Sequence, residues 1–170
     1  MVVIQMAGFP GSGKSTISKE VAKRLNAIVI DKDILKSSML ENGLSNETSS
    51  KLAYDVMFDL GKFYLEQGRS IVLDTPCYYD EIIENGMKLS KDYNTEYKFL
   101  DCIVKDYDII DKRLKLRKNM TSQITKYSLT GFENAKARAE KVRPSNGYMK
   151  VDSSNLDDIN YDLILEHLKV

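Results

Sequence analysis

The chain has no excess of charge of either sign and only one histidine. Its 170 residues contain 25 Lys and Arg and 25 Asp and Glu, so the formal net charge is zero. Proteins that bind nucleic acid or anionic membranes usually carry net positive charge, so this balance of charges disfavours a polynucleotide substrate and a membrane partner. The single histidine, His167, has no neighbour at metal-site or catalytic spacing and is left out of the candidate site.

Cysteine pairs and long apolar runs are also missing. Cys77 and Cys102 show neither C-x-x-C nor metal-ligand spacing, which predicts buried, reduced thiols. No run approaches the roughly 20 apolar residues of a membrane-spanning helix, and the N-terminus begins with a strand pattern in place of a signal peptide. With 42% hydrophobic residues, the chain is long enough for one core. We therefore expect one cytoplasmic domain over residues 1–170.

The most specific positive feature is a glycine-rich motif near the N-terminus. Residues 8–16 read Gly-Phe-Pro-Gly-Ser-Gly-Lys-Ser-Thr and match the phosphate-binding pattern G-x-x-x-x-G-K-[ST] at every fixed position. An apolar strand pattern precedes the motif and an amphipathic helix pattern follows it, so its backbone N–H groups can surround phosphates. The motif's lysine contacts the β- and γ-phosphates and its serine binds magnesium. The predicted nucleotide-binding residues here are Gly8, Pro10, Gly11, Ser12, Gly13, Lys14, Ser15 and Thr16, with Ser15 also a metal ligand.

Short apolar runs alternate with stretches of helical periodicity along the rest of the chain. This alternation is typical of an α/β protein with a parallel sheet. The predicted strands cover residues 2–6, 27–30, 70–73, 97–104 and 148–151, and the predicted helices begin near residue 13 and cover 80–91, 106–118, 156–168 and parts of 33–67. Between the second and third predicted strands, an apolar stripe is predicted to face the core, formed by Leu52, Val56, Leu60, Phe63 and Tyr64.

The third predicted strand ends in a carboxylate. The run Ile71–Asp74 has the form of a Walker B element, which places Asp74 at the carboxyl edge of the sheet beside the glycine-rich loop. We expect Asp74 to hold magnesium through a bound water. The alternative is that Asp74 only caps the following helix.

Two more carboxylates, Asp31 and Asp33, follow the second predicted strand. Ligands bind at this edge of open α/β sheets, so both residues and Lys36 are assigned to the acceptor side. We expect Asp33 to accept the proton of an attacking hydroxyl, or to orient it, and Asp31 to assist magnesium or substrate. The alternative is that Asp33 caps a helix beginning at Ile34, and both roles are compatible.

Arg113 and Arg117 are one helical turn apart, before a polar segment at about residues 117–132. We interpret this segment as a lid, with an ordinary surface loop as the alternative. One arginine is expected to stabilise the transferred phosphoryl group and the other to stack on the base, and a solvated helix face is the competing interpretation. Arg138 and Arg143 are weaker candidates for these tasks. Residues 151–154 lie either near the base or, as we favour, at the N-terminal cap of the last helix.

These motifs resemble the small P-loop kinases related to polynucleotide kinase, zeta toxin and chloramphenicol phosphotransferase, within the adenylate and shikimate kinase architecture. Residues 8–16, the Asp33-Ile34-Leu35-Lys36 sequence and residues 71–75 carry the resemblance. It implies a three-layer α/β/α fold, a five-stranded parallel sheet of order 2-3-1-4-5, a lid after the fourth strand, ATP, magnesium, and Asp33 as general base. Lys36 departs from the family pattern, because it offers a point charge where the family usually has a forked arginine.

Two hypotheses of function follow. The first is an ATP- and Mg²⁺-dependent kinase that transfers the γ-phosphoryl group to a hydroxyl or phosphate of a small molecule or nucleotide, with Lys14, Asp33, Arg113 and Arg117 as the catalytic set. The second is a nucleotide-responsive module, in which ATP orders the lid and exposes a partner surface without phosphoryl transfer. No guanine-reading Asn-Lys-x-Asp motif is present, which argues against a GTPase. Neither the acceptor nor an oligomeric state can be inferred from the sequence.

Overall fold

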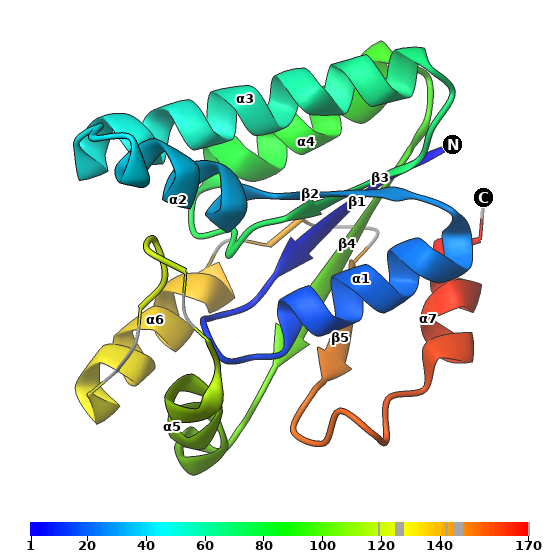
Figure 1. Cartoon of the computed structure of the whole chain (residues 1–170). Coiled ribbons are helices and arrows are strands. Elements are labelled where there is room, and N and C mark those ends of the chain that lie inside the picture. The colour runs from blue at the N-terminus through cyan, green and yellow to red at the C-terminus, as the bar shows by residue number, and fades with distance from the viewer. Residues whose placement is uncertain (119, 125–127, 142, 145–147, 170) are drawn as a thin grey trace.

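Five parallel strands form the centre of the molecule (Figure 1). The computed structural model describes residues 1–118, 120–124, 128–141, 143–144 and 148–169. The strands stand in the order β2-β3-β1-β4-β5, and all neighbouring pairs are parallel, which confirms the predicted topology. Their bounds are β1 Val2–Ala7, β2 Ile28–Asp31, β3 Ile71–Asp74, β4 Glu96–Ile103 and β5 Tyr148–Asp152.

The helices follow the strands along the chain. Their bounds are α1 Lys14–Leu25, α2 Lys32–Glu41, α3 Asn46–Glu66, α4 Asp80–Asp92, α5 Tyr107–Leu116, α6 Leu129–Lys141 and α7 Tyr161–Leu168. Within the described part of the chain, none of them is both long enough and apolar enough to span a membrane.

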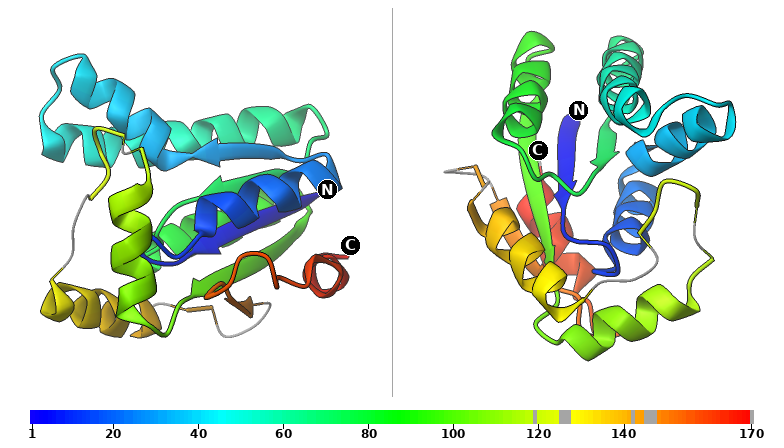
Figure 2. Two further views of the ribbon diagram at one scale, coloured as in Figure 1. Left: turned by 60° about the horizontal axis from the view of Figure 1, so that its bottom comes forward. Right: turned by 90° about the vertical axis from the view of Figure 1, so that its left-hand side faces the viewer.

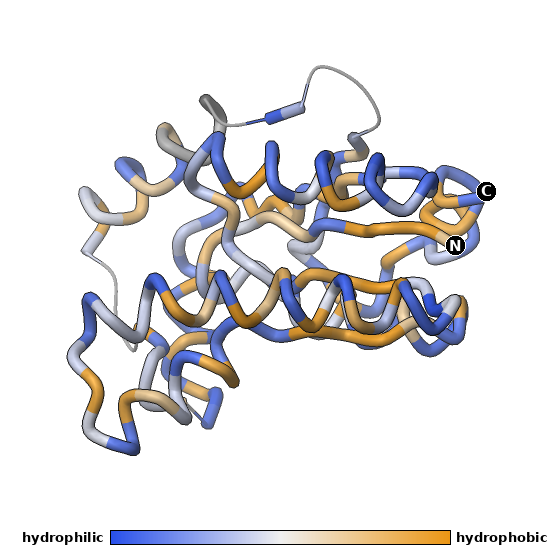
Figure 3. The backbone as a smooth tube through the Cα atoms, turned by 90° about the horizontal axis from the view of Figure 1, so that it is seen from above, coloured by the Kyte–Doolittle hydropathy of each residue, from blue (hydrophilic) through white to orange (hydrophobic). Residues whose placement is uncertain are grey.

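Helices cover both faces of the sheet and produce three layers (Figure 2). On one face, α1 and α7 pack on a core that includes Ile4, Ile17 and Ile164. On the other face, α3 and α4 pack through Met57 and Leu89. In the backbone tube of Figure 3, hydrophobic segments accordingly lie in the interior of the molecule, while the helices alternate between hydrophobic and hydrophilic residues. This packing of amphipathic helices on a buried parallel sheet is what the periodicity of the sequence predicts.

The buried face of α3 differs from the predicted stripe. Leu52 is 37% exposed and Phe63 is 54% exposed, whereas the fully or nearly buried positions are Ser49, Ala53, Met57, Gly61 and Leu65. The cause is the close approach of α3 to the sheet and to α4. A Cβ atom added to Gly61 would lie 2.9 Å from Leu89 Cδ2 and 3.2 Å from Ile71 Cδ1. Small residues therefore share the buried face with Met57 and Leu65, and Leu60 and Tyr64 of the predicted stripe are partly buried against this core.

Two predicted segments near the C-terminus also need correction. Helix α6 begins at Leu129, so residues 129–132 of the expected lid are helical, and residues 119 and 125–127 lie outside the described part. The last helix begins at Tyr161, not at residue 156, and its N-cap is Asn160, whose side chain accepts a hydrogen bond from Leu163 N at 3.0 Å. The predicted cap at residues 151–154 is therefore wrong.

The register of the sheet brings the predicted acidic residues together at one edge. Asp31 and Asp74 are direct partners in the parallel pairing of β2 with β3, so both carboxylates leave the sheet at the same level. The glycine-rich loop follows β1, the strand that lies next to β3. The carboxyl edge thus places the loop, Asp74 and Asp31 side by side, as the sequence predicts.

Candidate active site

The glycine-rich loop ends in a left-handed residue that starts α1. Gly13 is the N-cap of the helix, with φ 80°, and its carbonyl accepts hydrogen bonds from Thr16 N at 3.0 Å and Ile17 N at 3.1 Å. The left-handed φ favours glycine, and a Cβ atom at this position would lie 2.7 Å from Leu156 Cδ2, so that side chain would have to shift. The N–H groups of the first turn are unpaired within the helix and carry partial positive charge. This geometry fits a phosphate group.

Lys14 and Asp74 form a buried ion pair below the loop. Lys14 Nζ lies 2.9 Å from Asp74 Oδ1, and their side chains are 12% and 1% exposed. The other carboxylate oxygen, Asp74 Oδ2, accepts a hydrogen bond from Ser18 Oγ at 3.0 Å. Asp74 is therefore not a helix cap: it contacts two residues of the loop and α1, and the N-cap of α4 is Tyr79.

Asp31 is the N-cap of α2, contrary to the expectation that Asp33 caps this helix. Its Oδ1 accepts a hydrogen bond from Asp33 N at 2.8 Å, and α2 begins at Lys32. Capping by Asp31 satisfies one of the free N–H groups of the first turn. The Asp33 side chain is thereby left free of capping, and it lines the same cavity as the glycine-rich loop.

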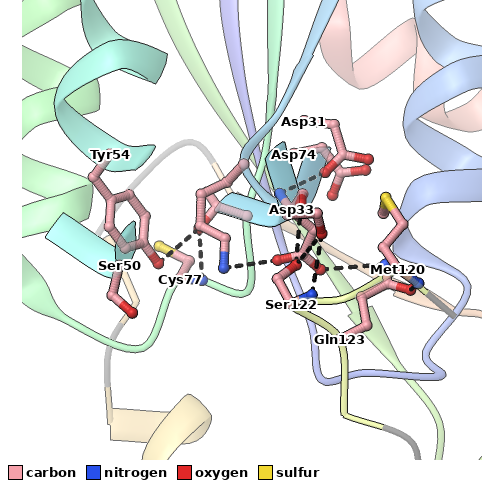
Figure 4. A network of polar contacts seen from close by, with 12 residues as sticks. Asp31, Asp33, Ser50, Tyr54, Asp74, Cys77, Met120, Ser122 and Gln123 are labelled. Carbon is pink, nitrogen blue, oxygen red and sulfur yellow. Dashed lines mark hydrogen bonds and ion pairs between the residues drawn. The ribbon is translucent and has the colours of Figure 1, made fainter. Parts of the chain in front are cut away.

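Two donors approach the Asp33 carboxylate from different segments. Lys32 Nζ lies 2.7 Å from Oδ1, and Gln123 Nε2 donates to Oδ2 at 3.3 Å (Figure 4). Burial disfavours the charged form of Asp33, but the nearby charges of Lys32 and Lys14 and these hydrogen bonds outweigh it. The pKa of Asp33 is consequently lowered from its ordinary value. Asp33 is thus ionised at neutral pH and can accept a proton or a hydrogen bond.

Three carboxylates surround the Lys14 ammonium group and affect its charge. Burial alone would lower the pKa of Lys14, but Asp74, Asp33 and Asp31 raise it above its ordinary value. Asp31 shows the opposite balance, because burial and the nearby Asp74 charge raise its pKa. Lys14 is therefore firmly cationic in a site where negative charge is crowded.

The two candidate arginines of α5 have different surroundings. Arg113 donates to the carbonyl oxygens of Ser153 at 2.7 Å, Ser154 at 3.0 Å and Gly11 at 3.4 Å. It joins α5 to the glycine-rich loop and to the segment after β5. Arg117 follows α5 and donates to Ile124 O at 2.7 Å, within the predicted lid. Both arginines line the cavity, and neither lies on a merely solvated face.

Of the two weaker candidates, the side chain of Arg138 lies outside the described part of the chain, and Arg143 does not line the cavity. It forms a two-pronged ion pair with Asp101, with Nε at 2.7 Å from Oδ2 and Nη2 at 2.8 Å from Oδ1. Its guanidinium also lies over the ring of Phe99, with Cζ 5.7 Å from the ring centroid. These contacts fasten the segment before β5 to β4, so Arg143 supports the fold at this point.

The oxygen donors at the loop fit magnesium. Among the described residues, no group of three or more His, Cys, Asp or Glu side chains forms a metal site. A closed protein cage is not what Mg²⁺ requires, because it usually takes one or two protein oxygens together with waters and substrate phosphates. The Ser15 hydroxyl and the Asp74 carboxylate provide that donor set beside the loop. The residues present therefore fit a magnesium ion that enters with a nucleotide.

One cavity of about 750 Å³ is lined by the glycine-rich loop together with Asp31, Asp33, Arg113 and Arg117. On the predicted acceptor side, Tyr54, Ser122 and Gln123 are among the residues that the sequence did not reveal as site residues. Tyr54 of α3 lies beneath Lys32, whose Nζ is 5.7 Å from the ring centroid, and the Tyr54 hydroxyl accepts a hydrogen bond from Thr75 Oγ1 at 3.2 Å. The remaining acceptor-side lining is provided by Lys36, Ser50, Pro76, Tyr78, Tyr79, Met120, Ser122 and Gln123.

Cys77 is near the site but does not belong to its chemistry. Its side chain is fully buried, and its Sγ accepts a hydrogen bond from Gln5 Nε2 at 3.2 Å. Burial raises the pKa of its thiol to about 12, so the thiolate is scarcely populated near neutral pH. Cys77 is a structural residue of the connection after β3, as the sequence predicts.

The sheet order, the loop and the strand-terminal Asp74 together define a P-loop nucleotide-binding protein with the architecture of the small P-loop kinases. The chain belongs to the AAA domain family, whose model matches residues 3–142. This match contains the glycine-rich loop, Asp31, Asp33, Asp74 and the whole of the predicted lid.

Similar solved structures cover the whole chain. A candidate kinase from Chloroflexus aurantiacus has a TM-score of 0.78 at 18% identity, with 99% of this chain and 96% of that chain covered. The Mycobacterium tuberculosis APS kinase CysC, in complex with AMPPNP and APS, has a TM-score of 0.63 at 16% identity, with 99% and 97% covered. A gluconokinase from Sinorhizobium meliloti has a TM-score of 0.59 at 13% identity, with 99% and 91% covered. At these identities the likeness establishes the fold.

Proposed function

We propose that this protein is an ATP- and Mg²⁺-dependent kinase that transfers the γ-phosphoryl group to a hydroxyl of a small molecule. The observation that carries the proposal is that Lys14, in the phosphate-binding loop, and the ionised carboxylate of Asp33 line one cavity. A donor site and a proton-accepting group that face the same space are the two halves that phosphoryl transfer to a hydroxyl requires.

A hydroxyl acceptor fits this cavity better than a phosphate acceptor. An acceptor phosphate needs unpaired positive charge beside it, whereas the acceptor side presents the carboxylates of Asp31 and Asp33. Of the two lysines among the described residues there, Lys32 is already paired with Asp33 at 2.7 Å. An ionised carboxylate repels a phosphate but accepts a hydrogen bond from a hydroxyl. The APS and sugar substrates named for the related structures belong to those proteins and supply only a choice of compounds to test.

Each residue has a definite task in the proposed reaction. The loop N–H groups and Lys14 bind the β- and γ-phosphates, and Asp33 takes the proton of the acceptor hydroxyl as its oxygen bonds to the γ-phosphorus. The bond from the γ-phosphorus to the bridging oxygen breaks, and ADP leaves with that electron pair. Ser15 and Asp74 would hold a magnesium ion, whose charge would offset that of the phosphate oxygens. Arg117 neutralises the transferred group, while Arg113 shapes the nucleotide side.

The test is acceptor-dependent ADP release by the purified protein. MgATP is offered with sugars, nucleosides, nucleoside monophosphates, APS and 5′-hydroxyl oligonucleotides, and ADP is measured by a coupled assay. We expect stimulation by a hydroxyl-bearing small molecule, and we expect Asp33→Asn to retain ATP affinity but lose about 100-fold in turnover. Lys36→Met is a matched variant that should raise the acceptor KM more than it lowers kcat. Intact ATP binding with no stimulation by any compound would contradict the kinase assignment.

The same panel discriminates the alternative of a nucleotide-responsive module. Such a module requires ATP to alter the exposure of the lid and the capture of a partner protein, with no acceptor-dependent turnover. Amide exchange of residues 120–124 with and without MgATP measures the first requirement directly. Productive transfer to a small molecule would exclude this alternative as the main activity.

A further inference from the structure

Residues 120–124, the described central part of the predicted lid, lie on α2. Ser122 N donates to Ser37 Oγ at 3.1 Å, the two serine hydroxyls are 2.8 Å apart, and Ser122 Oγ donates to Asp33 O at 3.0 Å. Ser37 is buried, at 5% exposure. Figure 4 shows Ser122 and Gln123 beside Asp33, on the side away from Tyr54. These contacts join segments about 90 positions apart in the chain, so the docking is specific.

The docked segment fixes the orientation of the Gln123 amide. Met120 N donates to Gln123 Oε1 at 3.3 Å, which uses the carbonyl end of the amide. The Nε2 end must then point the other way, and it donates to Asp33 Oδ2 at 3.3 Å. An amide whose two ends are each satisfied by a different partner cannot be turned over without the loss of both hydrogen bonds.

Asp33 is consequently held from two sides. Lys32, on its own helix, binds Oδ1, and Gln123, from the docked segment, binds Oδ2. The Lys32 contact is local and persists whatever the segment does, whereas the Gln123 contact exists only while residues 120–124 lie on α2. A carboxylate held at both oxygens keeps one orientation, and each oxygen retains a lone pair for the acceptor hydroxyl.

From this arrangement we propose that Gln123 is a positioning residue for Asp33, so that the carboxylate is aligned for proton transfer only when residues 120–124 are docked on α2. This inference rests on the proposed function, because it assigns Gln123 a task in that reaction. It couples the position of the lid to the acceptor side of the cavity. While the segment is docked, the acceptor enters a site whose base is already aligned. When the segment is released, we expect turnover to fall.

The test is a double-mutant cycle between Gln123 and Asp33, measured on the whole protein with γ-labelled MgATP. Water serves as the phosphoryl acceptor, and the most effective compound of the panel is used in parallel. Gln123→Met keeps the length of the side chain but removes its donor. We expect it to lower kcat about ten-fold in the wild-type background and less than about two-fold in the Asp33→Asn background, with the KM for MgATP unchanged. Gln123→Glu, which puts a carboxylate against Asp33, should lower kcat at least as much.

The matched control is Thr121→Val in the same segment. Thr121 Oγ1 donates to Glu41 Oε1 at 2.7 Å in an exposed position, so this hydrogen bond contributes little to the docking, and within the described part of the chain it does not involve Asp33. We expect its kcat to stay within about two-fold of wild type. Ser37→Ala should reproduce the loss seen with Gln123→Met and speed amide exchange at Ser122, and Ser37→Thr should restore both.

The outcomes separate this inference from the proposed function. Effects of Gln123→Met that are equal in both Asp33 backgrounds, or an equal loss in Thr121→Val, would overturn the positioning role in an active enzyme. Absence of turnover in the wild type, with water and with every compound of the panel, would overturn the proposed function itself. In that case slow exchange at Ser122 that Ser37→Ala abolishes would still establish the docking of the segment without a role in transfer.

Discussion

The buried pair of Lys14 and Asp74 predicts that the lysine of the phosphate-binding loop also stabilises the nucleotide-free protein. The perturbation is Lys14→Met, which keeps the length of the side chain and removes its charge. Asp74 is 1% exposed on its side chain, and without Lys14 its remaining side-chain hydrogen bond is the one from Ser18 Oγ at 3.0 Å. The substitution therefore leaves a buried carboxylate without its counter-charge.

The expected magnitude follows from this burial. Removal of one partner of a buried ion pair costs about 3–5 kcal/mol, because the remaining charge has lost its compensation. For a chain of this length, 1 kcal/mol corresponds to about 2–4 °C in Tm, so Lys14→Met should lower Tm by about 6–20 °C. Asp74→Asn should cost less, about 1–3 kcal/mol, because the Lys14 ammonium group is 12% exposed and can turn toward solvent. The double variant carries no uncompensated charge and should recover at least about 2 kcal/mol relative to Lys14→Met.

The assay is urea denaturation followed by circular dichroism, at pH 7 and without nucleotide or metal. Because its carboxylate neighbours raise the pKa of Lys14 above the ordinary value in spite of burial, the pair's contribution is fully present at this pH. The Lys14 side of that contribution is lost as the pH rises through the raised pKa. Lys23→Met, an exposed position on the same helix, is the control and should change stability by less than about 0.5 kcal/mol. A Lys14→Met variant within 1 kcal/mol of wild type, or additive effects in the double variant, would refute the reasoning.

Three further predictions concern the thiols, the loop and the nucleotide side. Cys77 and Cys102 are fully buried, and burial raises the pKa of both thiols. Neither thiol should therefore react with iodoacetamide at pH 8 until urea is added. Rapid labelling of the native protein would contradict this prediction. Gly13→Ala places a Cβ atom 2.7 Å from a leucine side chain, and we expect it to weaken ATP binding at least about ten-fold, as measured by calorimetry. The control is Gly43→Ala, where φ is also positive, at 84°, but no atom lies within 4 Å of the added Cβ. This variant shares only the backbone strain and should leave the affinity for ATP unchanged. A lysine at position 113 cannot satisfy the three carbonyl oxygens that Arg113 contacts. We therefore expect MgATP to raise the Tm of Arg113→Lys no more than it raises the Tm of Arg113→Ala. A rise in Tm equal to that of the wild type would show that the positive charge alone suffices.

The sheet and most of its helices could be predicted because their signals are local. Each strand is a short apolar run, and every residue of β1 is buried, so the pattern of the sequence follows directly from the burial of a central parallel strand. The failures occur where a distant contact decides. Leu156 fits the helical periodicity of the predicted last helix, but its side chain lies against Gly13 of the loop. The last helix begins only after Asn160. On α3, the closeness of α4 selects Gly61 over larger residues for the buried face.

The candidate site shows the same division. The loop and Asp74 could be predicted because a motif fixes their positions, and Asp33 because it follows a strand closely. Gln123 could not, since a single glutamine in a polar segment carries no sign that it meets a carboxylate 90 positions away. Lys32 was not predicted as a site residue for a different reason, which lies in its neighbours along the sequence. A lysine between two aspartates is typical of a solvated turn, but here it is 9% exposed over the ring of Tyr54 and paired with Asp33.

The charges of the cavity also indicate how nucleotide and metal binding depend on each other. In the nucleotide-free protein Lys14 compensates Asp74, and Lys32 compensates Asp33. Lys14 has a single ammonium group, so when it contacts the β- and γ-phosphates it no longer compensates Asp74 fully. The buried carboxylate then needs another positive charge, and a divalent cation with oxygen ligands is the group that suits both Asp74 and the phosphates. Under the proposed function, Asp74 would therefore link the two events, because it is paired with Lys14 in this structure and would favour the metal once the phosphates are bound. We accordingly expect ATP with magnesium to bind this site better than ATP alone.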